Sequence, residues 1–178
     1  MLKVLKEQLM NLSKNDADGF SAKISSRLPG KPGEEAVESL KSLILLMPSL
    51  ITQIRAWAND PRIPARDKEL HGFILTYLYH PVDFLPESEH GLFGYLDDAY
   101  FVGAVYANAL QHMDYGTRQL LPNMKSFETD VPRWLTIAKQ VIPEETKKMD
   151  ALLQELIQGR EDAFHRLMSQ EQPKEELV

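Results

Sequence analysis

Seven side chains that could act as acids, bases or metal ligands fall within nineteen consecutive residues in the middle of the chain. Hard cations such as Mg²⁺ and Mn²⁺ bind carboxylate oxygens, and imidazole can serve as an acid, a base or a ligand near neutral pH. This density marks residues 79–99, here called the acidic segment, as the place to look for a function. The seven residues are His80, Asp83, Glu87, Glu89, His90, Asp97 and Asp98.

A divalent-cation site is one interpretation of the acidic segment. It would require Asp83, at the end of one helix, to meet Glu87 and one of the following aspartates, Asp97 or Asp98. Neighbouring residues of an α-helix point about 100° apart, so Asp97 and Asp98 cannot both face one ion if both are helical. We therefore expect at most one of them to be a ligand. With such a site the protein would be a metal-dependent, hydrolase-like enzyme.

A structural role for the same carboxylates is the interpretation that we favour. Asp83 lies two residues after Pro81 and can accept backbone N–H groups in a turn or a helix cap. Asp97 and Asp98 lie near the expected start of a helix, where the helix dipole stabilises negative charge. This interpretation needs no cofactor. Recognition of a partner by these residues is the remaining alternative.

Two helices flank a pattern of Pro-x-Asp-x-x-Pro and then Gly-x-x-Asp-Asp, formed by Pro81, Asp83, Pro86, Gly94, Asp97 and Asp98. In this pattern residues 70–110 resemble the YkvA-like family, a domain of unknown function. The resemblance implies a helical hairpin and no reaction. It departs from the family at Glu87, where Asp is usual, and in a more polar loop. The family includes short bacterial proteins, some associated with membranes, and RING-type ubiquitin ligases.

Other catalytic patterns are missing from the sequence. It has no phosphate-binding glycine loop, no HExxH, no Gly-x-Ser-x-Gly and no EF-hand loop. The lack of cysteine excludes disulfides, thiolate metal sites and cysteine nucleophiles. His71, His112 and His165 lack the spaced partners of a zinc site, so we predict that they are surface or boundary residues.

The composition is that of one globular domain of 178 residues, with 43% hydrophobic and 26% charged residues. A net charge of −6 argues against a nucleic-acid partner. Lys6 and Glu7 interrupt the first apolar stretch, so no secretory signal is predicted, and no apolar run approaches the roughly 20 residues of a membrane span. We expect a cytoplasmic protein.

The elements that must position the acidic segment follow a helical period, which predicts an all-α bundle of six to eight helices. A long central helix is expected from Glu34 onward, and Asn59, Asp60 and Pro61 should end it. Pro48 should cause a kink or a break, and the unbroken apolar period across it favours the kink. Its apolar face comprises Val37, Leu40, Ile44, Met47, Ile51, Ile54 and Ala58, and Leu43, Leu50 and Trp57 widen it.

The acidic segment is expected to join the two helices of a hairpin, whose turn is Pro81 to Phe93. Tyr77 and Leu78, at the end of the first helix, should pack on the second helix, which spans about Leu96 to Met113. Small residues on the second helix would let a neighbour approach closely. The expected partners of Tyr77 and Leu78 are Ala99, Val102 and Gly103, and the small residues are Ala99, Gly103 and Ala107.

The two ends of the chain are predicted to be less firmly attached. Proline and glycine concentrate in residues 27–33, so residues 1–33 should form loosely attached helices and a hinge. A last helix is expected from Met149 to Leu167, and residues 170–178 should be a flexible tail.

The leading functional hypothesis is a non-catalytic helical interaction or adaptor protein with an unknown protein partner. A metal-dependent enzyme is the first alternative, and it requires the carboxylates to converge within about 5 Å in a concave pocket. The second alternative is peripheral membrane contact through the first helix, where Lys3 and Lys6 flank leucines.

Overall fold

The computed structural model describes residues 2–14, 19–28, 33–63, 65–78, 84–113 and 125–160, together with residues 162 and 166. Every regular element in these residues is helical, which confirms the predicted all-α bundle of six to eight helices. The elements are α1 (Leu2–Lys14), α2 (Phe20–Arg27), α3 (Glu34–Asn59), α4 (Ala65–Tyr77), α5 (Glu87–His90), the 3₁₀ helix η2 (Gly91–Tyr95), α6 (Leu96–His112), α8 (Lys125–Val141) and α9 (Pro143–Ile157).

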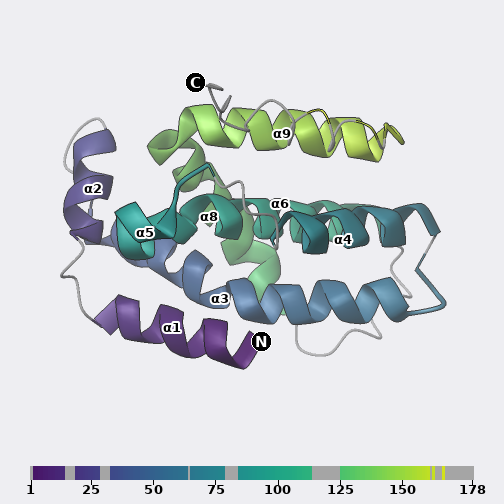
Figure 1. Cartoon of the computed structure of the whole chain (residues 1–178), viewed down its shortest axis with the longest axis horizontal. Coiled ribbons are helices and arrows are strands. Elements are labelled where there is room, and N and C mark those ends of the chain that lie inside the picture. The colour runs from purple at the N-terminus through teal and green to yellow at the C-terminus, as the bar shows by residue number, and fades with distance from the viewer. Residues whose placement is uncertain are drawn as a thin grey trace, which may run out of the picture.

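Helix α3 is the central helix, and its broad apolar face is buried as the sequence period predicts. The helix is continuous through Pro48. The carbonyl of Pro48 accepts a hydrogen bond from Thr52 Oγ1 at 2.8 Å. Figure 1 shows α3 changing direction along its length, as a proline inside a helix favours. The buried residues of α3 are Ser39, Leu40, Leu43, Ile44, Met47, Pro48, Leu50, Ile51, Ile54 and Trp57.

By length and composition, α3 is also long and apolar enough to cross a membrane, and among the described helices it alone meets that test. Half of the qualifying window is buried inside the structure, as in the core helix of a bundle. The expectation that no segment approaches the length of a membrane span is therefore too strict for this helix.

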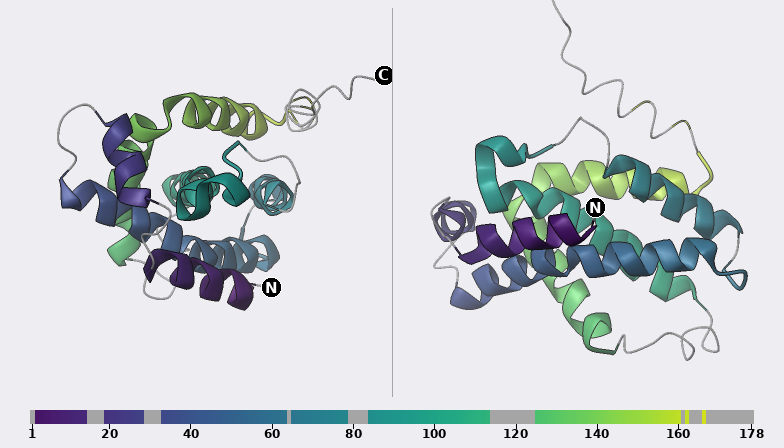
Figure 2. Two further views of the ribbon diagram at one scale, coloured as in Figure 1. Left: turned by 60° about the vertical axis from the view of Figure 1, so that its left-hand side comes forward. Right: turned by 60° about the horizontal axis from the view of Figure 1, so that its bottom comes forward.

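The helices are stacked in layers around α6. Figures 1 and 2 show α3 on one side of the neighbouring helices α4 and α6, α9 on the other side, and α1 on the outer side of α3. Helix α8 crosses this stack and contacts α3, α6 and α9. The close approach of α6 to its neighbours depends on Gly103, where a Cβ atom would lie 3.1 Å from Leu135 Cδ2 and 3.3 Å from Leu43 Cδ1. This confirms the prediction of a small residue at a helix contact.

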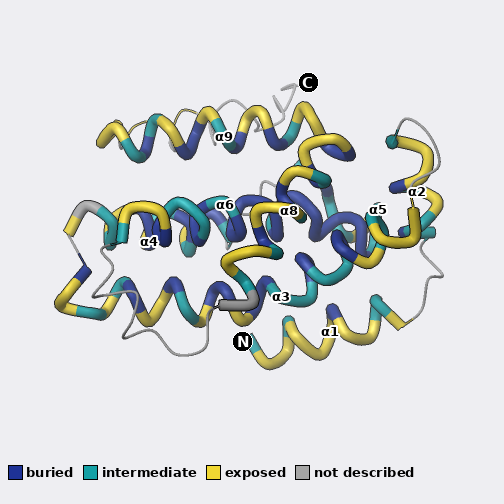
Figure 3. Tube along the Cα trace, turned by 180° about the vertical axis from the view of Figure 1, so that it is seen from behind, coloured by how far each residue is buried: buried dark blue, intermediate teal, exposed yellow. Residues whose placement is uncertain are grey.

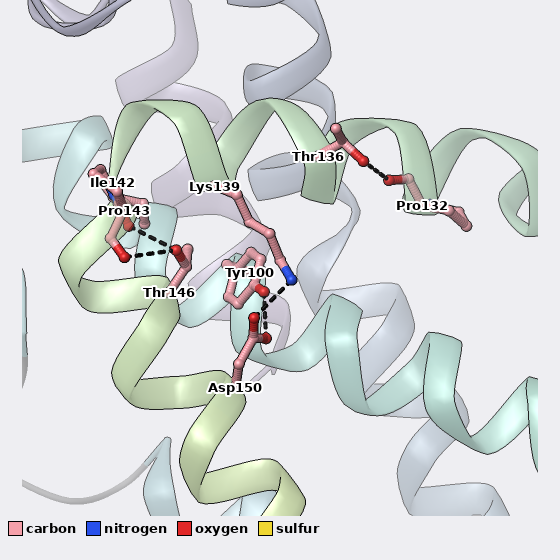
Figure 4. A network of polar contacts seen from close by, with 8 residues as sticks. All are labelled: Tyr100, Pro132, Thr136, Lys139, Ile142, Pro143, Thr146 and Asp150. Carbon is pink, nitrogen blue, oxygen red and sulfur yellow. Dashed lines mark hydrogen bonds and ion pairs between the residues drawn. The ribbon is translucent and has the colours of Figure 1, made fainter.

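A buried phenol and an ion pair join α6, α8 and α9 (Figure 4). Tyr100 Oη donates a hydrogen bond to Asp150 Oδ1 at 2.5 Å, and Lys139 Nζ lies 2.6 Å from Asp150 Oδ2. Burial raises the pKa of Tyr100, and the adjacent Asp150 carboxylate raises it further. The phenol therefore stays a hydrogen-bond donor, and the network holds α9 against the two other helices.

Helix α9 ends earlier than the sequence reading predicted, at Ile157 rather than near Leu167. Gly159 adopts φ 77°, a left-handed conformation that glycine accommodates best. Its N–H bonds the carbonyl of Leu156, and the N–H of Arg160 bonds that of Glu155, which is the pairing of a Schellman C-cap. Helix α9 therefore ends before Gly159. Phe164 and Leu167, which the prediction placed in this helix, lie outside the described residues.

The first two helices lie on the outside of the bundle. Helix α1 packs on α3 and η2, and α2 contacts η2, α3 and α8. Leu9 of α1 is fully buried, whereas Val4 and Met10 are 64% and 43% exposed. In Figure 3 most of α1 is exposed or half-buried, while buried positions line α6.

We predict that amide hydrogens of α1 exchange faster than those of α3. Helix α1 buries Leu9 alone, whereas α3 buries ten residues, so local opening of α1 exposes less apolar surface and costs less free energy. Hydrogen exchange followed by mass spectrometry measures this difference. Equal protection of α1 and α3 would contradict the loose attachment of residues 1–33.

Candidate functional site

The acidic segment lies at one end of the bundle, between α4 and α6. Its second half is helical, because α5 and η2 occupy residues that the sequence interpretation assigned to a turn from Pro81 to Phe93. The predicted site residues Pro81 and Asp83, and also His80, lie outside the described residues. Pro86 is the N-cap of α5 and accepts backbone hydrogen bonds from Glu89 and His90.

The two helices of the expected hairpin pack against each other, as predicted. The ring of Tyr77, at the end of α4, lies edge-on to the ring of Phe101 on α6, with ring centroids 4.9 Å apart. Tyr77 also stacks near Phe84, whose ring centroid is 6.3 Å away. Aromatic contacts therefore join the acidic segment to both helices.

Gly94 permits the tightest backbone contact of the segment. A Cβ atom at this position would lie 2.6 Å from Glu87 Cα, 2.9 Å from Glu87 N and 3.0 Å from the carbonyl oxygen of Leu85. These are backbone atoms, which cannot turn away as a flexible side chain can. Steric fit therefore explains why glycine occupies position 94: the absence of a Cβ atom lets η2 lie directly on the start of α5.

We predict that Gly94→Ala destabilises the protein by about 1–3 kcal/mol, because the added methyl group would force two backbone segments apart. Gly72→Ala is the matched control. A Cβ at Gly72, inside α4, meets nothing within 4 Å, so this change should stabilise by about 0.5–1 kcal/mol through helix propensity. Urea unfolding of both variants gives the comparison, and an unchanged Gly94→Ala midpoint would refute the close contact.

The paired aspartates occupy the first turn of α6, where the helix dipole favours negative charge. Their surroundings differ, since Asp97 is fully buried and Asp98 is half-buried at the surface of a cavity. The expectation that the two side chains diverge is therefore confirmed. Asp97 is part of the core, and Asp98 lines the cavity.

We predict that Asp97→Ala lowers the melting temperature more than Asp98→Ala does. Losing a buried charged acceptor costs about 1–3 kcal/mol, equivalent to about 2–4 °C per kcal/mol at this chain length. Thermal melts with chelator and with excess Mg²⁺, Mn²⁺ or Zn²⁺ give the second comparison. A large cation-specific stabilisation that either substitution abolishes would contradict the structural role and favour a metal site.

A cavity of about 190 Å³ lies where α1 and α3 meet the acidic segment; we call it the corner cavity. Its walls are mainly aliphatic, and its polar groups are the carboxylates of Glu87 and Asp98 and the phenol of Tyr95. The chain thus brings two of the predicted site residues to one concavity. The lining residues are Leu2, Leu5, Met47, Ile51, Leu78, Glu87, Tyr95 and Asp98.

The first two helices secure this corner. Gln8 Nε2 of α1 donates a hydrogen bond to Tyr95 Oη at 2.7 Å. Lys23 Nζ of α2 donates to the carbonyl oxygen of His90 at 3.0 Å, where α5 ends. The guanidinium of Arg27 lies 4.9 Å from the centre of the Phe93 ring. Helices that the sequence suggested were peripheral therefore contribute walls and contacts to the candidate site.

No group of three or more acidic or imidazole side chains that could hold a metal ion occurs among the described residues. The proposed ligand Asp83 lies outside them, so the metal hypothesis stays a prediction. Glu87 and Asp98 together offer two negative charges beside an aliphatic wall. This chemistry suits a cation that carries an apolar stem.

One histidine lies inside the core, which the sequence did not predict. His71 is fully buried rather than at the surface, so its prediction as a surface or boundary residue is wrong. It lies among apolar positions of α4 and beside Trp57 of α3. His112 is exposed, as predicted, and His165 lies outside the described residues.

Comparison of the chain with protein-family models, curated proteins and solved structures finds no match. The resemblance of residues 70–110 to the YkvA-like family therefore stays a prediction.

Proposed function

We propose that the protein is a non-catalytic helical interaction protein that receives a lysine or arginine side chain of a partner protein in the corner cavity. The single observation that carries this proposal is the cavity itself, with Glu87 and Asp98 beside aliphatic walls. The cytoplasmic location and the YkvA-like assignment predicted from the sequence belong to the same proposal.

The size of the cavity favours one side chain over a cofactor or a large substrate. Sites for drug-sized ligands and cofactors occupy about 300–1,000 Å³. The corner cavity measures about 190 Å³. That volume equals roughly six water molecules at about 30 Å³ each, which is the scale of a single long side chain.

The chemistry of the walls favours a cationic side chain. Lysine and arginine bury an aliphatic stem while their charged head reaches polar groups. Leu5, Met47 and Ile51 would contact such a stem, and Glu87 and Asp98 would pair with the head. Both carboxylates are half-buried, so they are less screened than fully exposed acids.

The metal-dependent enzyme is the second candidate, because the same two carboxylates could contribute to a cation site with Asp83. It would use the acids for coordination and leave the aliphatic wall without a role. Peripheral membrane contact is the third candidate, and the net charge of −6 weakens it at an anionic lipid surface.

We predict that n-pentylammonium and n-butylguanidinium, which mimic the two side chains, bind more tightly than neutral 1-pentanol. Methyl NMR of Met47, which lines the cavity, would report binding at millimolar concentrations. The charged probes should lose about tenfold in affinity in a Glu87→Gln/Asp98→Asn variant, since each charged hydrogen bond contributes about 1.5–3 kcal/mol before solvent screening.

Glu128→Gln is the matched control, because Glu128 lines a different cavity between α6 and α8. It should leave all three affinities unchanged. Equal binding of 1-pentanol and n-pentylammonium would overturn the proposal. Mn²⁺ broadening of the Met47 methyl signal that is lost in the Glu87→Gln/Asp98→Asn variant would favour the metal-dependent enzyme instead.

A further inference from the structure

Three aromatic rings from three helices form a stack at the centre of the bundle; we call it the ring stack. The Trp57 ring of α3 contacts both the His71 ring of α4, which is tilted to it, and the Tyr106 ring of α6. Its centroid is 5.9 Å from that of His71 and 5.3 Å from that of Tyr106, to which it is nearly parallel. The exposed fractions are 0% for His71 and Tyr106 and 1% for Trp57.

The polar atoms of the ring stack have no hydrogen-bond partner among the residues that the structure describes. This holds for Trp57 Nε1, both ring nitrogens of His71 and Tyr106 Oη, each of which is buried. A buried polar atom without a partner costs free energy, and a buried charge without a partner costs far more. His71 can therefore occupy the stack only as a neutral imidazole.

The environment of His71 opposes its protonation. Burial lowers the pKa of His71 below its ordinary value near 6.5, and the charge of Asp67 only partly offsets this. Helices α3 and α6 both pack on α4. In the ring stack α6 contributes the titratable phenol of Tyr106, and α3 contributes the indole of Trp57, which does not titrate. Burial, and then the charge of Glu128, raise the pKa of Tyr106, so it stays neutral as well.

A polar place for a charged His71 lies one helical turn away. Asp67 precedes His71 by four residues, so the two share one side of α4. Asp67 also lines a cavity of about 150 Å³ that opens between α4, α6 and α9. Leu70, the neighbour of His71, lines it too, and α6 contributes Asn108 and His112. A carboxylate and a solvent-connected space are thus within reach of the imidazole.

We propose that His71 is an acid-sensitive switch: on protonation its side chain leaves the ring stack, enters the cavity between α4, α6 and α9, and pairs with Asp67. The vacated position removes one face of the contact with Trp57 and weakens the packing of α4 on α3 and α6. Helix α4 leads directly into the acidic segment, so the change would reach the candidate site.

The direction of the pH effect follows from linkage. Well above the ordinary value near 6.5, where even an imidazole paired with Asp67 has lost its proton, the packed and the released imidazole are both neutral, and the full stability of the packed state is present. As the pH falls toward and below 6.5, the released or unfolded form binds a proton that the packed form resists. The packed state therefore loses stability through the window from about 6.5 downward to the lowered pKa of His71.

Trp57 fluorescence between pH 8 and pH 5, in a Trp134→Phe background that leaves one indole, tests this proposal. We expect a reversible change with helical content preserved by circular dichroism, and an imidazole NMR titration of His71 with the same midpoint. Asp67→Asn should move that midpoint down by about one pH unit, because it removes the charge that stabilises the released imidazolium.

His71→Phe should abolish the fluorescence transition, and His112→Gln, which changes the other histidine at the cavity, should leave the midpoint in place. If His71→Phe fails to fold, the imidazole titration of His71 in the wild type and in Asp67→Asn still tests the switch. An unshifted midpoint in Asp67→Asn overturns the pairing with Asp67. A fluorescence transition that persists in His71→Phe, or a His71 titration without any change at Trp57, overturns the switch.

Discussion

The packing of α3 against α6 is the contact on which the rest of the structure depends. Helices α1, α4 and α8 rest on α3, and α4, α8, α9 and η2 rest on α6. Gly103 lets α6 approach both α3 and α8, because any larger residue there would meet Leu43 and Leu135. Apolar burial is non-directional, so this steric fit is what sets the order of the layers.

The acidic segment meets two structural requirements at once. It must place two acidic side chains where a helix dipole accommodates them, and its backbone must fold back tightly enough to join α4 to α6. The first turn of α6 meets the first requirement and Gly94 meets the second. Asp97 is buried in the core and Asp98 lines the corner cavity, so one pair of neighbouring residues reaches two different environments.

The sequence predicted the elements well where the apolar period was long. Helices α3 and α6, the continuity of α3 across Pro48 and the divergence of Asp97 from Asp98 all follow from a 3.6-residue period. Three features did not follow. The end of α9 depends on the left-handed backbone of Gly159, and a glycine in a sequence signals a helix end only weakly. The corner cavity is lined by residues as distant in sequence as Leu2 and Asp98, and no local sequence pattern reveals that they lie close together. His71 is a polar residue type, and its burial beside Trp57 involves a contact between two helices that no local pattern reveals.

The ring stack makes part of the stability of the core depend on the protonation state of one residue, His71. Aliphatic residues such as Leu40 and Ile44 stabilise the bundle at every pH, since nothing in them titrates. Trp57, His71 and Tyr106 contribute large apolar surfaces to the same core, but they bring polar atoms that no group in the described part of the chain satisfies. Their contribution therefore depends on the imidazole remaining neutral. Helix α4, which carries His71, ends at Tyr77, and the next residue, Leu78, lines the corner cavity.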